Sequence, residues 1–278
     1  MPGKTIELYL VNGTTDSLVV ADILGRDCKA LKLPRTEVSV CANENIKKAG
    51  VYFLFCHDDN GNDSVYIGEA ENIQDRLLQH IRDYNVGKET YYWNTAVLFV
   101  GQDLDKAHIR YLEDQLFTIA KSCNRYKILT KNTFKNTRIK DSHQPMLEEF
   151  VENVRLLISA LGYRVLEKVP TPEDTTMYFY CKSNGSDAKG FISSGGFTIM
   201  KGSKLTDVVA PSFEKYAPSY FELRKRLETD GTIVNGVFQS NYEFSAPSTA
   251  AAVILGRNAN GKLEWKTEDG TPLKDTSI

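Results

Sequence analysis

The sequence predicts an α+β protein with two folded parts. The chain has 278 residues, which is long for one compact domain and comfortable for two. Runs rich in β-branched residues, which indicate strands, alternate with segments whose apolar residues recur every three to four positions, which indicates helices. Residues 167–176, EKVPTPEDTT, have the two prolines and mixed charges of a linker, and glycine-rich strands follow them.

The first forty residues are predicted to form strands. IELYLV and SLVVADI are separated by the turn sequence NGTTD, and KALKLP ends at Pro34. Two further apolar runs flank a turn rich in Asp, Asn and Gly between Gly50 and Gly68, which predicts a β-hairpin. By strand alternation, Tyr52 should face away from the core residues of its own strand, Val51, Phe53 and Phe55.

Helical periodicity predicts three helices before the linker. They span about Ala70–Tyr84, Asp105–Ser122 and Pro145–Leu161, and NTAVLFVG between the first two is a predicted buried strand. Asp103 or Asp105 is the expected N-cap of the second helix, and Gly162 the expected end of the third.

After the linker, the pattern predicts strands, a helix carrying Tyr220, Leu223 and Leu227, and then a second helix. In FSAPSTAAAVILG, a serine-proline cap is expected to start that second helix and Gly256 to end it. Asn260-Gly261 is expected to form a turn before a strand that holds Trp265.

Composition narrows the class of protein. The five cysteines are odd in number and include no Cys-x-x-Cys pair, which predicts reduced thiols and a cytoplasmic protein. No apolar run reaches the roughly 18 to 20 residues of a membrane helix, and the N-terminus lacks the pattern of a secretory signal, so no membrane partner is expected. The net charge of −2 excludes a general nucleic-acid coat protein but allows a local basic site.

A set of polar residues near the hairpin suits phosphodiester hydrolysis. Tyr52 and Tyr66 lie in its two strands, and Arg76 and His80 share a helix face because they are four residues apart. Glu113 stands among apolar neighbours of the next helix. An arginine can bind phosphate oxygens, a carboxylate can hold a divalent metal, and a tyrosine assisted by histidine can activate water.

A basic tract follows the second helix. KSCNRYKILTKNTFKNTRIK, residues 121–140, contains seven cations and no Asp or Glu, which favours contact with nucleic acid. The cations are Lys121, Arg125, Lys127, Lys131, Lys135, Arg138 and Lys140. The remaining histidines, His57, His108 and His143, are not at metal-ligand spacing.

Residues 41–134 resemble the GIY-YIG nuclease superfamily. The resemblance rests on Gly50-Val51-Tyr52 and Tyr66-Ile67-Gly68, whose tyrosines are fourteen positions apart, on Arg76 ten residues later and on Glu113 in a later helix. It implies a small three-stranded sheet flanked by helices within residues 41–144. That domain would lie between a β-rich N-terminal extension, 1–40, and a helix and linker, 145–176, with a second α+β domain at 177–278.

The resemblance also implies a role for each site residue. Tyr52 would activate water, Tyr66 would position water or phosphate, Arg76 would clamp the phosphate, and Glu113 would hold Mg²⁺ or Mn²⁺. His80 would support Tyr52, as in restriction-type members of the superfamily. Members of the superfamily usually carry an asparagine after the Glu helix, for which Asn124 fits by spacing and Asn132 by the segment that follows it.

The expected function is therefore a divalent-metal-dependent endonuclease acting on DNA, with RNA as an alternative substrate and a dimer needed to cut both strands at once. The alternatives are a non-cleaving nucleic-acid-binding module of the same fold and a protein-interaction scaffold. The segment SAPSTAAAVILGRNANGKLEWK resembles an uncharacterised domain that often follows GIY-YIG modules in bacterial proteins, which implies target selection by the C-terminal part.

Overall fold

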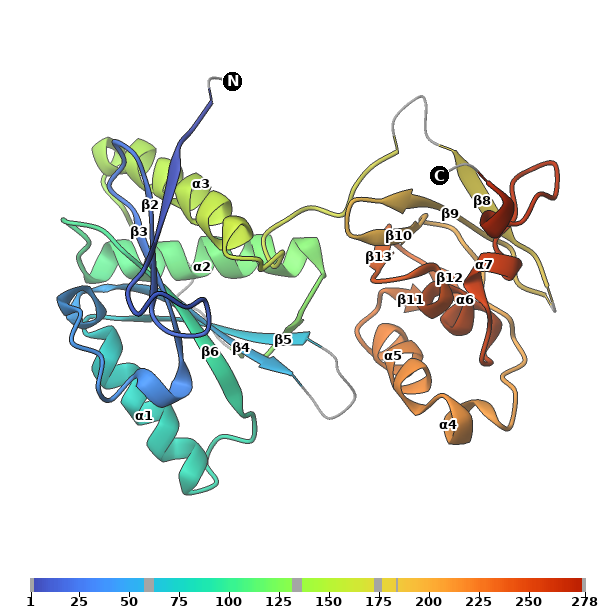
Figure 1. Ribbon diagram of the computed structural model, residues 1–278, viewed down its shortest axis with the longest axis horizontal. Coiled ribbons are helices and arrows are strands. Elements are labelled where there is room, and N and C mark those ends of the chain that lie inside the picture. Colours follow the sequence, from blue (N-terminus) through green and yellow to red (C-terminus); the bar gives the residue numbers. More distant parts are fainter. Residues whose placement is uncertain (1–2, 58–62, 132–136, 173–176, 184, 277–278) are drawn as a thin grey trace. The chain divides into compact units, whose positions relative to one another are not determined.

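The computed structural model describes residues 3–57, 63–131, 137–172, 177–183 and 185–276. The chain is an α+β protein, as the sequence predicts, and it divides into two compact units, Met1–Glu167 and Lys168–Ile278 (Figure 1). The division falls at the start of the proline-containing segment that was predicted to be a linker.

The first unit contains a sheet of seven strands in the order β1-β2-β3-β6-β4-β5-β7. The expected three-stranded sheet is therefore too small. Its strands β6, β4 and β5 form the centre, and β3 continues the sheet by pairing with β6 from Lys29↔Val100 to Pro34↔Thr95. Strands β1, β2 and β3, which lie within the predicted N-terminal extension, thus belong to the same sheet. The strands are β1 Ile6–Leu10, β2 Val19–Ile23, β3 Lys29–Pro34, β4 Gly50–His57, β5 Asp63–Ala70, β6 Trp93–Val100 and β7 Lys127–Ile128.

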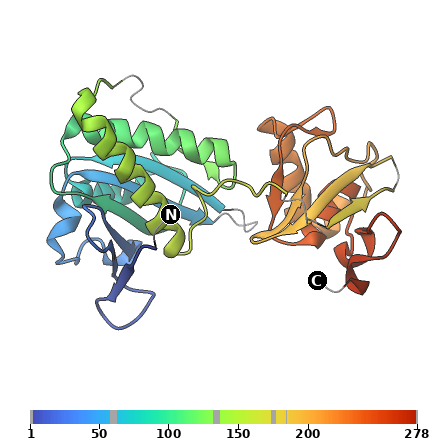
Figure 2. The ribbon, with the colours of Figure 1, turned by 90° about the horizontal axis from the view of Figure 1, so that it is seen from above.

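Helices cover both faces of this sheet. Helix α1, Ile73–Asn85, lies on one face, and α2, Lys106–Cys123, and α3, Gln144–Ala160, lie together on the other (Figures 1 and 2). Short 3₁₀ turns complete the unit: η1 Arg35–Glu37, η2 Glu44–Lys47 and η3 Asp141–His143. Helix α3 packs on α2, β2 and β3, so it belongs to this unit and not to the linker.

The hairpin strand β4 contributes to two apolar cores. Val51, Phe53 and Phe55 pack on the α2 and α3 side, whereas Tyr52 and Leu54 pack on the α1 side. The predicted alternation of Tyr52 is confirmed. It places the Tyr52 phenol on the face that carries α1, where Arg76 and His80 also lie.

The helix ends follow the capping rules. The Asp105 side chain, and not that of Asp103, accepts the His108 backbone N–H at 2.9 Å and begins α2. Asn124 ends α2 in the left-handed conformation, with φ of 50°. Gly162 follows α3 with φ of 93°, as predicted for its end.

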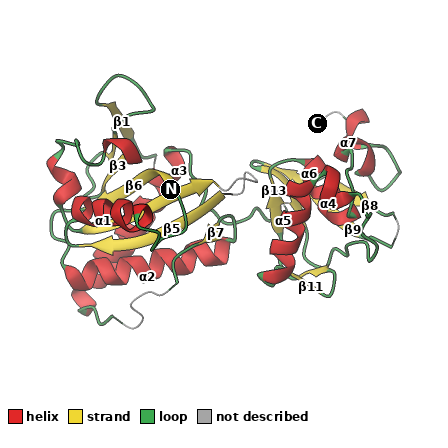
Figure 3. Cartoon of the chain, turned by 90° about the horizontal axis from the view of Figure 1, so that it is seen from below, coloured by secondary structure: helices red, strands yellow, loops and turns green. Residues whose placement is uncertain are grey.

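The second unit has a four-stranded antiparallel sheet in the order β13-β10-β9-β8 and a separate pair, β11 with β12 (Figure 3). Its strands are β8 Tyr178–Cys181, β9 Ala188–Ser193, β10 Gly196–Ile199, β11 Ile233–Val234, β12 Val237–Phe238 and β13 Tyr242–Phe244. Its helices are α4 Phe213–Tyr216, α5 Pro218–Thr229, α6 Pro247–Leu255 and α7 Gly261–Glu264, with the 3₁₀ turn η4 Leu273–Asp275.

Two local predictions for this unit are wrong. The N-cap of α6 is Ala246, which makes no side-chain capping bond, so the helix starts through Pro247 in its first turn and not through a serine cap. Asn260 is the N-cap of α7, because its side chain accepts the Lys262 N–H, and it does not form a hairpin turn. Trp265 follows α7, is fully buried, and donates its indole N–H to the Pro247 carbonyl at 2.9 Å.

Candidate active site

The glycines of the two motif triplets, Gly50 and Gly68, make room for a tyrosine and for the neighbouring strand. Tyr52 of β4 lies opposite Gly68 of β5, and a Cβ atom at Gly68 would lie 2.5 Å from the Tyr52 hydroxyl oxygen. A Cβ atom at Gly50 would lie 2.1 Å from the Phe99 carbonyl oxygen on β6. Both approaches are closer than real Cβ atoms allow, so each triplet needs its glycine for packing.

Tyr52, His80 and Glu89 form a continuous chain of hydrogen bonds. The Tyr52 hydroxyl lies 2.9 Å from Nε2 of His80, and Nδ1 of His80 lies 2.7 Å from a carboxylate oxygen of Glu89. Tyr52 and His80 are buried, with 1% and 0% of their surfaces exposed. The sequence predicted that His80 supports Tyr52, and the side chains are in contact.

Tyr66 packs against the same group. Its ring is stacked 6.2 Å from that of Tyr52 and 5.8 Å from that of Tyr91, and it meets the His80 ring edge-on at 5.0 Å. Tyr66 is partly exposed, whereas Tyr52 is buried. The two tyrosines of the motif are therefore neighbours, and Tyr66 is the one that solvent reaches.

Burial keeps the tyrosines and the histidine uncharged. It raises the pKa of Tyr52 well above 10, and the neighbouring Tyr66 adds to the effect while the Arg76 charge opposes it. Burial also raises the pKa of Tyr66, and the Arg76 charge again opposes this effect. The pKa of His80 falls to about 3 because of burial and the positive charges of Arg76 and Arg35. At neutral pH the Tyr52 phenol and the His80 imidazole are therefore both uncharged.

Arg76 is half-buried beside both phenols. Burial lowers its pKa, but interactions with Tyr52 and Tyr66 more than offset this, and the pKa lies above the usual arginine value. Its Nη1 also donates to the Gln79 side chain at 2.8 Å. Within the cluster, Arg76 supplies a permanent positive charge next to two neutral hydroxyl groups.

Glu113 is buried in α2, with 5% of its surface exposed. Within the described residues, its Oε2 has no hydrogen-bond partner. Burial, followed by repulsion from Glu69 and Asp114, raises its pKa to about 7. Two cations earlier in α2 lie near other carboxylates: Lys106 pairs with Glu71 at 2.7 Å, and Arg110 lies 3.7 Å from Glu69.

This carboxylate fits a divalent cation. An unpartnered buried oxygen with a second carboxylate nearby is stabilised by positive charge, and Mg²⁺ takes one or two carboxylates together with waters and phosphate oxygens. The part of the chain that the structure describes holds no group of three or more Asp, Glu, His or Cys side chains suited to a metal. A cation at Glu113 would therefore take most of its ligands from water and substrate.

The predicted asparagine and the basic tract lie further along the chain. Asn124 is eleven residues beyond Glu113, or about 16 Å along the helix axis, and it ends α2 instead of joining the cluster. Asn132 and Lys135 lie outside the described residues. The exposed cations of the tract are Lys121, Lys127, Lys131, Arg138 and Lys140. Arg125 is half-buried and donates from Nε to the Glu167 carbonyl at 2.8 Å.

Sequence reasoning missed Glu89, Tyr91 and Thr130. Glu89 lies after the end of α1, so no helical spacing relates it to His80. Thr130 lies within the basic tract, where its hydroxyl accepts the Ile67 N–H at 2.7 Å and donates to the Ile67 carbonyl at 2.8 Å. These two hydrogen bonds extend the pairing of β7 with β5, so the start of the basic tract packs beside the strand that carries Tyr66.

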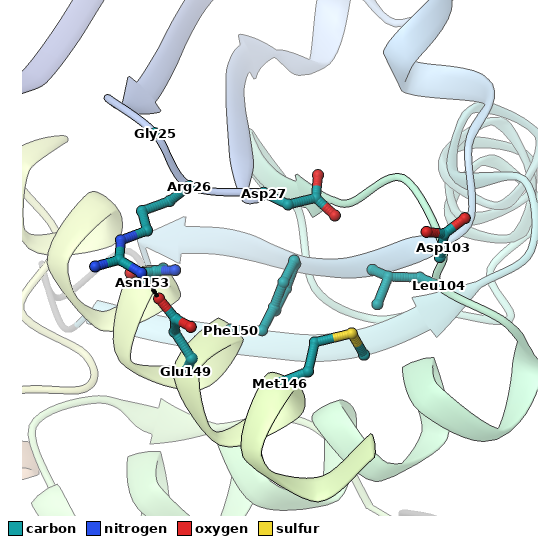
Figure 4. Close-up of a pocket in the computed structure, with 9 residues that line it drawn as sticks. All are labelled: Gly25, Arg26, Asp27, Asp103, Leu104, Met146, Glu149, Phe150 and Asn153. Atoms are coloured by element: carbon teal, nitrogen blue, oxygen red, sulfur yellow. Dashed lines mark hydrogen bonds and ion pairs between the residues drawn. The ribbon is translucent and has the colours of Figure 1, made fainter. Parts of the chain in front are cut away.

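A cavity of about 150 Å³ lies apart from this cluster, between the β2–β3 turn, the β6–α2 loop and α3 (Figure 4). Arg26 and Glu149 form an ion pair at one end, and Asp27 and Asp103 lie toward the other. The histidine pair His108 and His143, bonded at 2.8 Å, joins α2 to η3. None of these residues belongs to the tyrosine cluster.

A family model described as a domain of unknown function, DUF4357, matches residues 179–277, which lie in the second unit. No curated protein and no solved structure matched the chain. Among the described residues, no helix has the length and apolar character that crossing a membrane requires.

Proposed function

We propose that the first unit is a divalent-metal-dependent endonuclease of the GIY-YIG type, which hydrolyses phosphodiester bonds in DNA. The observation that carries this proposal is the buried Tyr52 hydroxyl, held 2.9 Å from Nε2 of a neutral His80 and beside Arg76. A simple packing role would not require a buried imidazole at the hydroxyl, since a buried phenol is satisfied by one backbone carbonyl.

In this proposal, Tyr52 is the proton acceptor for the attacking water. Because its pKa is raised well above 10, Tyr52 carries its proton in the resting state and cannot act first as a phenolate. It can accept a proton from water only while it passes its own to Nε2 of His80. The water oxygen then bonds to phosphorus as the bond to the leaving oxygen breaks.

Arg76 and Tyr66 are placed to bind the substrate phosphate. Arg76 is positive at every physiological pH and can donate two parallel hydrogen bonds to non-bridging oxygens. Tyr66 reaches solvent and stacks on Tyr52, so its hydroxyl can hold a phosphate oxygen or the water. The exposed cations Lys127 and Lys131 lie in and just after β7, which pairs with β5, and they would contact the DNA backbone.

Glu113 would hold Mg²⁺ or Mn²⁺ through its unpartnered oxygen. When bound, such an ion would stabilise the negative charge that develops on the phosphate. The raised pKa of Glu113, about 7, means that proton and cation compete for this carboxylate near neutral pH. The second unit, which matches DUF4357, would select the target.

The test is cleavage of plasmid, branched and methylated DNA and of RNA, with Mg²⁺ or Mn²⁺, by the wild-type chain, Glu113→Gln and Tyr52→Phe. Removing a general base costs about 10²- to 10⁴-fold, so we expect Tyr52→Phe to lose cleavage to that extent. Glu113→Gln should lose cleavage as well, because it removes the carboxylate proposed to hold the cation. The matched control is Glu152→Gln on the exposed side of α3, which should cleave at the wild-type rate. Binding without cleavage by the wild type would refute the nuclease and favour a binding module, and the absence of salt-dependent binding would favour a scaffold.

A further inference from the structure

Glu89 completes the hydrogen-bond chain that begins at Tyr52. Its carboxylate lies 2.7 Å from Nδ1 of His80, whose other nitrogen faces the Tyr52 hydroxyl. We propose that Glu89 is a positioning residue that keeps the His80 hydrogen on Nδ1, so that Nε2 can accept the proton of Tyr52. Its role in catalysis rests on the proposed nuclease function, whereas its effect on the imidazole does not.

The position of the ring hydrogen follows from the two contacts. A neutral imidazole has one N–H group and one acceptor nitrogen. An ionised carboxylate can only accept, so the hydrogen lies on Nδ1 and the Tyr52 hydroxyl donates to Nε2. If Glu89 were protonated, it would donate to Nδ1, and the hydrogen on Nε2 would point at the Tyr52 oxygen. In that arrangement Tyr52 has no acceptor for its proton.

The backbone fixes Glu89 in this place. After α1 the chain turns, and the N–H groups of Lys88 and Glu89 donate to the Asp83 carbonyl at 2.9 and 3.3 Å. The buried Arg35 guanidinium lies 5.1 Å from the ring centre of Tyr84 at the start of this segment and 4.7 Å from that of Tyr92 at its end. The segment that carries Glu89 is therefore held at both ends.

The charges around Glu89 favour its ionised form only in part. Burial raises its pKa, while a hydrogen bond with Tyr91 and the positive charges of Arg76 and Arg35 lower it. Asp83, which is paired with Lys88 at 3.7 Å, raises it further. The pKa of Glu89 lies above 4.5 as a result. As the pH falls, the hydrogen bonds between Glu89, His80 and Tyr52 therefore reverse direction at a higher pH than they would with a solvent-exposed glutamate.

In the proposed step, the proton of Tyr52 moves to Nε2 of His80 while Tyr52 takes a proton from water. The water oxygen bonds to phosphorus, the bond from phosphorus to the leaving oxygen breaks, and His80 becomes an imidazolium. The carboxylate of Glu89 stabilises that positive charge and does not itself take the proton, which is the part that a carboxylate plays in hydrolases with a carboxylate–imidazole pair.

The decisive measurement is a two-dimensional ¹⁵N–¹H spectrum of the histidine rings in the full chain, with and without Glu89→Gln. The chain has four histidines, and His80→Gln identifies the His80 signals by their loss. We expect hydrogen on Nδ1 in the wild type. In Glu89→Gln, the amide can donate to Nδ1 or accept from it, so the hydrogen is no longer held on Nδ1 and a fraction of it should appear on Nε2. A wild-type hydrogen on Nε2 would overturn the proposal.

Cleavage kinetics provide the second measurement. Glu89→Gln should lower kcat about 10²-fold or more with an unchanged KM for DNA, because it removes the charge that holds the hydrogen on Nδ1 and stabilises the imidazolium, and leaves the phosphate contacts intact. Glu152→Gln is again the control, since it makes the same substitution on an exposed surface. If the wild type cleaves no substrate, the nuclease proposal fails, and the ring spectrum still decides whether Glu89 sets the imidazole hydrogen.

Discussion

Replacement of Glu113 by glutamine should stabilise the first unit at pH 8 while it abolishes the proposed cleavage. The pKa of this carboxyl is raised from 4.5 to about 7, mainly by burial, so above pH 7 the folded state holds an ionised group that the unfolded state solvates better. At 1.36 kcal/mol per pKa unit, this difference corresponds to about 3 kcal/mol. Partial access of water reduces the cost, and we expect a gain of about 1–3 kcal/mol.

The dependence on pH separates this effect from other consequences of the substitution. A carboxyl whose pKa is higher in the folded state destabilises the protein above that pKa, and the penalty disappears as the pH falls toward the unfolded value of 4.5. The advantage of Glu113→Gln should therefore be full at pH 8, smaller at pH 6 and absent near pH 4.5. Other changes, such as altered packing, would be the same at each pH.

The assay is urea unfolding followed by tryptophan fluorescence. The chain has two tryptophans, and Trp265→Phe leaves the buried Trp93 of β6 to report on the first unit. In that background, midpoints are compared with and without Glu113→Gln at three pH values, first in the absence of divalent metal and then with Mg²⁺. Mg²⁺ should raise the midpoint only of the protein that keeps Glu113. Equal stability of the two proteins at pH 8 would refute the claim that Glu113 is a buried carboxylate repelled by its neighbours, and with it the proposed cation site.

Two further predictions concern the hairpin and the basic tract. Gly68→Ala places a Cβ atom 2.5 Å from the Tyr52 hydroxyl oxygen, so it should separate Tyr52 from His80 and lower cleavage at least about tenfold, measured beside an unchanged far-UV circular dichroism spectrum; Gly3→Ala, in open space and without a positive φ, controls for the loss of a glycine. Lys127→Ala should weaken DNA binding and lower the slope of log affinity against log salt by about 1, measured by fluorescence anisotropy, with the exposed Lys4→Ala, outside the basic tract, as control; an unchanged slope would place the DNA elsewhere.

The sequence predicted the elements better than their assembly. Periodicity located all three helices of the first unit, because each buries one apolar face. It could not show that β3 pairs with β6, since that pairing joins residues about sixty positions apart and leaves no local trace. In the second unit, Asn260-Gly261 has the composition of a turn, but the Asn260 side chain caps a short helix instead.

The same contrast applies to the candidate site. Tyr52, Arg76 and His80 could be linked from the sequence because alternation in a strand and a spacing of four in a helix fix directions of side chains. Glu89 could not, because its place beside His80 depends on a turn anchored to the Asp83 carbonyl. A turn of this kind has no periodicity, and its outcome is decided by tertiary contacts such as those of Arg35 with the flanking aromatic rings.

The charge of the cluster sets the order in which its ligands should bind. Burial holds Tyr52, Tyr66 and His80 neutral, half of the Glu113 carboxyls carry a proton near pH 7, and the Glu89 carboxylate contacts the opposite nitrogen of His80, so Arg76 is the charge beside the two phenols. In the proposed nuclease, Arg76 would therefore attract a phosphate before Glu113 takes a cation. A bound phosphate would offer oxygen ligands and negative charge to Mg²⁺, and Glu113 would have to lose its remaining proton to hold the ion. Metal binding should therefore be weak in the free protein and stronger in the presence of DNA, with release of a proton that calorimetry in buffers of different ionisation enthalpy can measure.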